Sequence, residues 1–309
     1  MGKFIISLDF ELHWGVFDML DDTYNENILG ARVSIDKMLK LFKKYDIHVT
    51  WAIVGFLFNE DKNDFEQYRP QLLPSYTNKK LNSYNCEIGE NETVDSFHYA
   101  HSIIKLIKSY PNQEIASHSY SHYYCKEEGQ TLNEFEEDIK SAIAIAKDKF
   151  SVDLKSFVFP RNEINEDYLN VLYKYGFTNY RSNPSFWVYQ NGHNINLIGK
   201  IIRFLDSYFN VAGHSVSNAI KNKELLSIKG DRFLRPFKNK FVNRLMINRI
   251  KSEMKCAALN NKNYHLWWHP HNFGLNMDEN MNNLENILIY YSLLKNKWNM
   301  ESVCMEEVQ

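Results

Sequence analysis

The stretch "SLDFELHWG", residues 7–15, extends an apolar run that begins at Phe4, and it adds two carboxylates and a histidine to the end of that run. The apolar run predicts a buried strand. Side chains alternate along an extended chain, so Asp9, Glu11 and His13 are predicted to share one face. Polar groups gathered at the end of a buried strand indicate a functional site.

Extended and helical patterns alternate along the rest of the chain. Buried strands are predicted at 48–55, 114–117, 156–160 and 264–268, with further extended segments at 177–181, 200–205 and 300–305. Apolar spacing predicts helices at 30–45, 96–109, 165–176 and around 284–294, and a longer helical stretch at 213–262. Another helix is expected after Thr131, because Thr131 and Glu134 have the spacing of a capping box.

This alternation of strands and helices is typical of parallel βαβ units. We therefore expect an α/β fold with one barrel-like domain over residues 1–309, whose reactive groups lie at the C-terminal ends of its strands. Segments 59–95 and 213–262 are predicted to be elaborations of that domain. The basic run at 231–236 is predicted to be a solvated face.

Composition narrows the classes of partner. A net charge of -2 and a pI near 6.6 argue against duplex nucleic acid or an anionic membrane surface as the main partner, while local basic patches are compatible with this charge. No apolar segment approaches the roughly 20 residues that span a bilayer. The start of the chain lacks the pattern of a secretory signal, so a cytoplasmic location is expected. The four cysteines are scattered without a CxxC pair, which favours reduced thiols over disulfides or a thiolate metal site.

Polar clusters follow three more predicted strands. His118 and His122 are four residues apart, and on a helix they would share one face and could hold one cation. By itself this spacing is weak, but a carboxylate from another strand end would complete a catalytic zinc site. Arg161 follows a strand in "FPRN" and could fix Asp9 and keep it ionised. The histidines of "HPHN", residues 269–272, are candidate general acids.

Together these motifs resemble the NodB-type polysaccharide deacetylases, carbohydrate esterase family 4. The match rests on "SLDFE" (residues 7–11), "HSYSH" (118–122), "FPRN" (159–162) and "LWWHPHN" (266–272), which occur in the family's order. The spaced pair Asp9-x-Glu11 is similar to the acidic motif of one subgroup, in place of the usual adjacent Asp-Asp. The third motif has Pro160-Arg161 instead of the usual Arg-x-Pro.

The resemblance implies a distorted (β/α) barrel of about seven parallel strands and a role for each motif residue. Glu11, His118 and His122 would bind Zn²⁺, or another divalent ion such as Co²⁺, Ni²⁺ or Mn²⁺. Asp9 would be the catalytic base, unless Asp9 and Glu11 exchange roles. Arg161 would orient the base. His269 would be the general acid, with His271 as the alternative and Asp206 as a residue that could tune it. Substrate contacts are expected from His13, Trp14, Asn162, Trp187, Trp268 and His271.

The implied reaction is metal-assisted removal of an N- or O-linked acetyl group from a sugar. With a cytoplasmic location, the substrate would be a nucleotide- or lipid-linked intermediate of surface polysaccharide synthesis. Two alternatives stay open: an amidohydrolase of a small non-peptide C–N substrate on the same fold, and a carbohydrate-binding homologue without turnover. The sequence does not indicate an oligomeric state.

Overall fold

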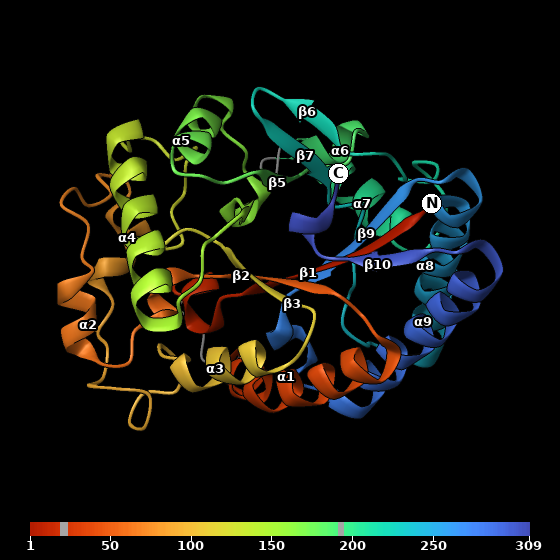
Figure 1. Ribbon diagram of the computed structural model, residues 1–309, viewed down its shortest axis with the longest axis horizontal. Helices are drawn as coiled ribbons and strands as arrows, with labels where there is room; N and C mark the ends of the chain where they lie inside the picture. The colour runs from red at the N-terminus through yellow and green to blue at the C-terminus, as the bar shows by residue number, and fades with distance from the viewer. Residues whose placement is uncertain (19–23, 191–194) are drawn as a thin grey trace.

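The computed structural model describes residues 1–18, 24–190 and 195–309 (Figure 1). Ten strands of this described part form one sheet. They are β1 (Lys3–Phe10), β2 (Val49–Ile53), β3 (Gln113–Ser117), β4 (Ser156–Val158), β5 (Asn179–Ser182), β6 (Ile220–Asn222), β7 (Leu225–Lys229), β8 (Arg232–Phe233), β9 (Asn263–Trp268) and β10 (Glu301–Val303). Their order is β6-β7-β5-β4-β3-β2-β1-β9-β8, and β10 pairs with β1. All the pairs are parallel except β6 with β7.

The sheet curls because one short stretch of chain pairs with strands that lie far apart in it. β7 pairs with β5, and β8 pairs with β9. Only Gly230 and Asp231 separate β7 from β8, so the end of β7 and the start of β8 are at most about 11 Å apart. The two sides of the sheet are therefore drawn together. The expected α/β fold is confirmed as a curled, largely parallel sheet, while the count of about seven barrel strands stays a prediction.

Helices lie around the outside of this sheet, as Figure 1 shows. They are α1 (Asn25–Tyr45), α2 (Lys62–Gln67), α3 (His101–Ser109), α4 (Leu132–Phe150), α5 (Leu169–Lys174), α6 (Trp187–Gln190), α7 (Leu197–Asp206), α8 (Lys240–Asn260) and α9 (Met277–Trp298). Helix α9 packs against both α1 and α8. The capping box predicted at the start of α4 is confirmed, since the Thr131 and Glu134 side chains each accept a hydrogen bond from the other residue's backbone N–H.

The two faces of β1 meet different surroundings. Its even-numbered side chains Phe4, Ile6 and Leu8 belong to the large core beneath the helices. Ile5, on the opposite face, packs in a smaller cluster with Met305, from the C-terminal 3-10 helix η9 (Met305–Glu307). The C-terminal segment thus lies against the interior of the curled sheet, and Asp9 is farther along the same face of β1.

Three predicted elements differ from the structure. Residues 200–205 are predicted to be extended but lie in α7. The stretch 213–262 contains three strands before α8, rather than one long helical region. Its basic run is not a solvated face, because Arg232 is buried and donates hydrogen bonds to the carboxylates of Glu253 and Asp206. The short alternation in β7 and β8 is easily mistaken for helical spacing.

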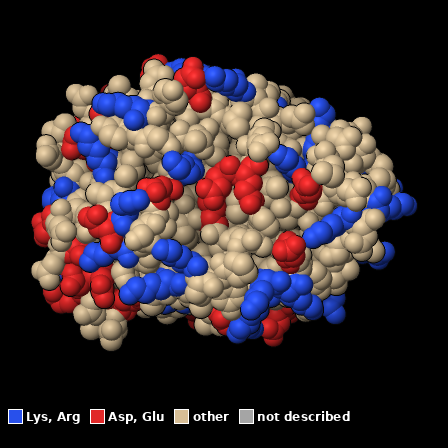
Figure 2. Space-filling view, viewed as in Figure 1, with Lys and Arg blue, Asp and Glu red and all other residues tan. Residues whose placement is uncertain are grey.

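The distribution of charge on the surface and the polarity of the helices agree with the small net charge and the lack of a long apolar segment. On the face shown in Figure 2, basic and acidic side chains are interspersed and do not form one large field of a single sign. Among the described residues, no helix combines the length and the apolar character needed to cross a membrane.

Candidate metal centre and catalytic pocket

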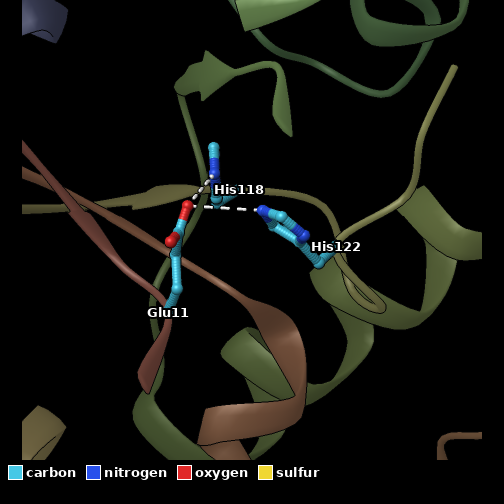
Figure 3. Close-up of side chains that lie close together, drawn as sticks. All are labelled: Glu11, His118 and His122. Carbon is cyan, nitrogen blue, oxygen red and sulfur yellow. Dashed lines mark hydrogen bonds and ion pairs between the residues drawn. The ribbon is translucent and has the colours of Figure 1, made fainter. Parts of the chain in front are cut away.

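Three possible metal ligands converge where β1 and β3 end. Figure 3 shows Glu11, His118 and His122 pointing toward one another. Nε2 of His118 lies 2.9 Å from Oε1 of Glu11, and Nε2 of His122 lies 3.3 Å from the same oxygen. All three residues are buried, and one ligand atom from each lies within 4.8 Å of the others. Two imidazole nitrogens and a carboxylate oxygen form the ligand set of many catalytic zinc sites.

Hydrogen bonds orient the two imidazoles. Nδ1–H of His118 donates to the Val158 carbonyl at 2.8 Å, so Nε2 is the atom that faces Glu11. Burial lowers the pKa of His122, which favours the neutral ring that binds metals. For Glu11, burial acts to raise the pKa, but the charge of His269 and the close contacts with the two imidazoles lower it well below its usual range. Glu11 and His122 therefore favour the protonation states of metal ligands.

The two histidines lie on an irregular loop, not on the helix that their spacing predicts. Residues 118–124 are irregular, and Ser119 and His122 have left-handed backbone conformations, with φ of 61° and 57°. Asp138, on α4, holds this loop by accepting hydrogen bonds from the backbone N–H groups of Tyr120 at 2.6 Å and Ser121 at 3.0 Å. A sharp turn, rather than one helical turn, brings the two rings to the same point.

A second buried pair lies beside the histidine cluster. Both oxygens of Asp9 accept hydrogen bonds from the guanidinium of Arg181, at 2.7 Å and 2.6 Å. Arg181 also donates to Ser7 Oγ at 2.9 Å and to Asn162 Oδ1 at 2.8 Å, and it lies 4.3 Å from the centre of the Trp267 ring. These contacts fix the Asp9 carboxylate and offset its charge in a site where both groups are only 2% exposed.

His269 completes the group from the end of β9. Its Nε2 lies 3.8 Å from Oδ2 of Asp9 and 3.7 Å from Oε1 of Glu11. Its ring stacks on that of His271, with the two centres 4.9 Å apart. His269 is 23% exposed at the side chain, whereas His271 is buried. Burial, followed by the charge of His269, lowers the pKa of His271 to about 3. His271 therefore stays neutral near neutral pH.

A family model described as polysaccharide deacetylase matches residues 17–180, more than half of the 309-residue chain. The chain belongs to the polysaccharide deacetylase family. The match includes both histidines of the cluster but not Asp9, Glu11 or His269, which the fold brings to them. None of the curated proteins matches the chain in sequence.

Solved structures agree with this assignment at the level of the fold. The chain is 11% identical to a probable polysaccharide deacetylase from Pseudomonas aeruginosa PAO1, with a TM-score of 0.61 over 99% of this chain and 89% of that one. It is 12% identical to the Puue allantoinase, with a TM-score of 0.57 over 99% of this chain and 88% of that one. At such low identity the likeness shows a shared fold and says nothing about substrate.

In this deacetylase-family chain, the reactive groups line one pocket of about 450 Å³. Asp9, Glu11, His122 and His269 contribute to its wall. Trp267 and Phe233 add an aromatic surface, and their rings lie 4.7 Å apart. The pocket therefore combines a carboxylate and histidine centre with flat apolar rings of the kind on which a sugar stacks.

The prediction that Arg161 orients Asp9 is wrong. In this deacetylase-family chain Arg161 forms ion pairs with Asp18 and Glu127, and its guanidinium lies 3.8 Å from the centre of the Tyr124 ring. The guanidinium that holds Asp9 belongs to Arg181, at the end of the next strand, β5. Arg161 follows β4 and Arg181 lies within β5, and their positions in the sequence could not decide which one turns inward to the carboxylate.

Several predicted substrate contacts lie elsewhere. The predictions for Trp14 and Trp268 are wrong, because both rings are buried in the core and neither lines the pocket. Trp187 is exposed on α6 but is not part of the pocket wall. His13 does not share a face with Glu11, because the chain leaves the strand after Phe10. Its ring packs on His98 instead.

Other predicted residues do line the pocket. Asn162 and His271 are both part of its wall, and Asn162 also accepts from Arg181. Asp206 does not tune His269, because its carboxylate pairs with Arg232 and Arg249. Sequence reasoning missed Arg181 as the partner of Asp9. The available signal was its place at the end of the extended segment predicted at 177–181.

Proposed function

We propose that this protein is a metal-dependent hydrolase that removes an N- or O-linked acetyl group from a sugar. The observation that carries the proposal is the convergence of Glu11, His118 and His122 on one point, with Asp9 and His269 beside them on the same pocket wall. Family membership supports a deacetylase, and the geometry supports a working site rather than a fold that has lost turnover.

The donor set fits zinc or a similar divalent ion. Since Nδ1–H of His118 is used by a backbone carbonyl, its Nε2 offers a lone pair toward the Glu11 oxygen 2.9 Å away. A cation between these atoms relieves the repulsion between two acceptors. When bound, such an ion supplies a Lewis acid that acidifies water and polarises a carbonyl. Cobalt, nickel and manganese also suit these ligands.

We assign the base to Asp9 and the metal-binding carboxylate to Glu11. Oε1 of Glu11 is the oxygen that faces both histidines, whereas both oxygens of Asp9 are directed by Arg181. Asp9 accepts the proton of the attacking water, and the guanidinium stabilises the orientation of the carboxylate throughout. General base catalysis of this kind typically contributes about 10² to 10⁴ in rate. The spaced Asp9-x-Glu11 pair thus divides two tasks between neighbouring carboxylates.

We assign the general acid to His269 rather than His271. His269 is partly exposed to the pocket, and its Nε2 lies within 4 Å of both carboxylates, so its ring is placed to reach a bound substrate. His271 is buried and its pKa is lowered to about 3, so it has no proton to give near neutral pH. In this scheme His269 protonates the leaving amine or hydroxyl of the sugar.

The proposed substrate is a nucleotide- or lipid-linked sugar of surface polysaccharide synthesis, handled in the cytoplasm by a single domain. The aromatic pair of Trp267 and Phe233 in the pocket wall favours a sugar ring over a small amide. An amidohydrolase of a small C–N substrate is the second candidate, favoured by the fold that the chain shares with an allantoinase.

Acetate release from acetylated sugars and sugar nucleotides by zinc-loaded protein tests this proposal, with allantoin as the competing substrate. We expect release from at least one sugar class and its loss in Asp9→Asn. His13→Ala, next to the motif but outside the pocket wall, is the matched control and should keep activity. Turnover of allantoin alone would favour the second candidate, and sugar binding without any turnover would identify a binding homologue.

A further inference from the structure

Helix α7 exposes its apolar face and turns a charged residue inward, the reverse of the usual arrangement in a surface helix. Its apolar side chains Leu197, Ile198, Ile201, Phe204 and Leu205 form one face, and each is between 41% and 73% exposed. We call these five residues the α7 face. The side of the helix that is turned inward carries Asp206, which is buried and ion-paired. A surface helix normally buries its apolar stripe, so an exposed stripe of this size indicates a binding surface.

The apolar surface continues beyond the helix. Phe209 and Val211, which follow α7 directly, are 52% and 48% exposed. Trp187 of α6, which packs against α7, is 53% exposed. Aromatic and aliphatic side chains grouped on one surface are typical of segments that insert into the boundary between lipid headgroups and acyl chains.

Charge around the α7 face favours an anionic occupant. Residues 185–240 hold nine Lys and Arg but only three Asp and Glu, although the whole chain has a net charge of -2. Two of those acids, Asp206 and Asp231, are buried, and the third, Glu224, pairs with Lys221. Among the bases, Arg232 is buried and paired with Glu253, whereas Lys200 on α7 and Lys223, Lys238 and Lys240 elsewhere in this stretch are exposed. An excess of exposed lysines in the stretch that carries the α7 face complements a bilayer that contains acidic lipids.

The α7 face is joined to the catalytic pocket through its own helix. Arg203 of α7 and Ser207, the residue at its C-terminal end, line the pocket wall. Arg235 also lines it, and its guanidinium Nε–H donates to Ser207 Oγ at 2.9 Å. In the described part of the chain, no carboxylate lies within 4 Å of Arg235. The pocket thus has a cationic wall on the side where the apolar surface begins.

We propose that the α7 face binds the surface of an anionic lipid bilayer and thereby presents the pocket to a sugar carried on a lipid phosphate. This inference rests on the proposed function and selects the lipid-linked substrate from the two classes named above. The apolar side chains enter the headgroup region, and the pocket wall at Arg203 and Arg235 meets the phosphate that joins sugar to lipid. A second copy of this chain is less well matched, because Lys200 on the α7 face and the excess of lysines in the same stretch would meet their own copies.

Co-sedimentation of the full-length protein with vesicles tests the α7 face directly. The probes are vesicles of phosphatidylcholine alone and of phosphatidylcholine mixed with phosphatidylglycerol. We expect binding to the mixed vesicles that weakens as salt rises. Ile198→Ser/Ile201→Ser should reduce the binding constant about tenfold through loss of apolar contact, and Ile198→Glu/Ile201→Glu should reduce it further. Both positions are exposed and outside the pocket wall, so acetate release from soluble sugars should be unchanged.

Ile289→Glu/Leu293→Glu on α9 is the matched control, since these side chains are 47% and 58% exposed on another helix. It should bind vesicles as the unaltered protein does. Equal loss in the control, or no binding to either vesicle, overturns the α7 assignment. A dimer in light scattering that Ile198→Ser/Ile201→Ser dissociates, without vesicle binding, also overturns it in favour of a second copy. Vesicle binding without acetate release from any sugar would overturn only the proposed function.

Discussion

Two buried carboxylates lie at opposite ends of the same curled sheet and have different partners. Asp9 is near the C-terminal end of β1, and a guanidinium holds both of its oxygens. Glu114 is near the N-terminal end of β3, where Oε2 accepts from the Thr50 hydroxyl and, at 3.3 Å, from the backbone N–H of Glu306. Its Oε1 has no hydrogen-bond partner among the described residues.

The difference between them separates a reactive group from a structural one. Arg181 offsets the charge of Asp9 without closing access to it, since Asp9 still lines the pocket. Glu114 has no cationic partner in the described part of the chain, and burial, partly opposed by its hydrogen bonds, raises its pKa to about 7. The carboxylate with a cationic partner thus lies at the end of the sheet that lines the pocket, and the carboxylate without one lies beneath the C-terminal segment.

The largest expected effect comes from removing the negative charge of Asp9. Asp9→Asn should lower the rate of acetate release about 100- to 10,000-fold, the usual contribution of a general base. Metal content should stay unchanged, because this substitution leaves Glu11 and both histidines in place. Glu114→Gln is the paired variant and should retain activity. If both variants lose activity equally, the two ends of the sheet do not have separate roles.

Removing the cation instead of the carboxylate should cost stability. Arg181→Leu leaves Asp9 buried and unpaired, so the free energy of unfolding in urea should fall by about 3–5 kcal/mol. The double variant Asp9→Asn/Arg181→Leu removes the stranded charge and should recover much of that loss. A single variant that unfolds at the same urea concentration as the unaltered protein would contradict the buried ion pair.

The raised pKa of Glu114 predicts a distinct dependence of stability on pH. A carboxyl group whose pKa is higher in the folded than in the unfolded chain stabilises the fold at low pH, and this stability is lost as pH rises from about 4.5 to about 7. Glu114→Gln removes this loss. The variant should therefore gain about 3 kcal/mol relative to the unaltered protein between about pH 4 and pH 8. Urea unfolding across this range measures the difference, and a constant difference would show that Glu114 does not titrate there.

The smallest expected effect concerns Asp138, a third buried carboxylate, which positions the histidine loop without touching the metal ligands' reactive atoms. Asp138→Asn replaces one of the two side-chain oxygens that accept from the backbone N–H groups of Tyr120 and Ser121 with an N–H donor, so the loop should loosen and metal affinity should fall about tenfold. Chelator competition measures that affinity. Asp148→Asn, an exposed position on the same helix, should bind metal as the unaltered protein does.

Much of this arrangement could be predicted from the sequence, because the reactive groups follow strands with strong apolar patterns. Asp9, Glu11 and His269 were located by their places at the ends of such strands, and His118 and His122 by their spacing. The predicted helix at this spacing is wrong, since a turn with left-handed residues brings the two rings together. The identity of the candidate ligands can therefore be predicted from their positions in the sequence even where the backbone conformation between them cannot.

Choices between neighbouring candidates required the fold. Arg161 and Arg181 both lie near strand ends, and the structure shows that Arg181, within β5, reaches Asp9, whereas Arg161, in the turn after β4, pairs with Glu127. Trp267 and Trp268 are adjacent on β9 and point to opposite faces, so one lines the pocket and the other is core. Helix α7 has helical apolar spacing at 197, 198, 201, 204 and 205, which the extended prediction at 200–205 overlooks; that this face is exposed could not be predicted, because apolar periodicity usually marks a buried face.

The central claim is that Glu11, His118 and His122 form a metal site, and elemental analysis of protein purified without added metal tests it most directly. We expect nearly one zinc, or another divalent transition metal, per chain, and its loss in His118→Ala/His122→Ala. His13→Ala/His98→Ala, which removes a histidine pair outside the pocket wall, should keep the metal. No metal in the unaltered protein even after reconstitution with zinc, or equal metal in the His118→Ala/His122→Ala variant, would contradict the site and the hydrolysis built on it.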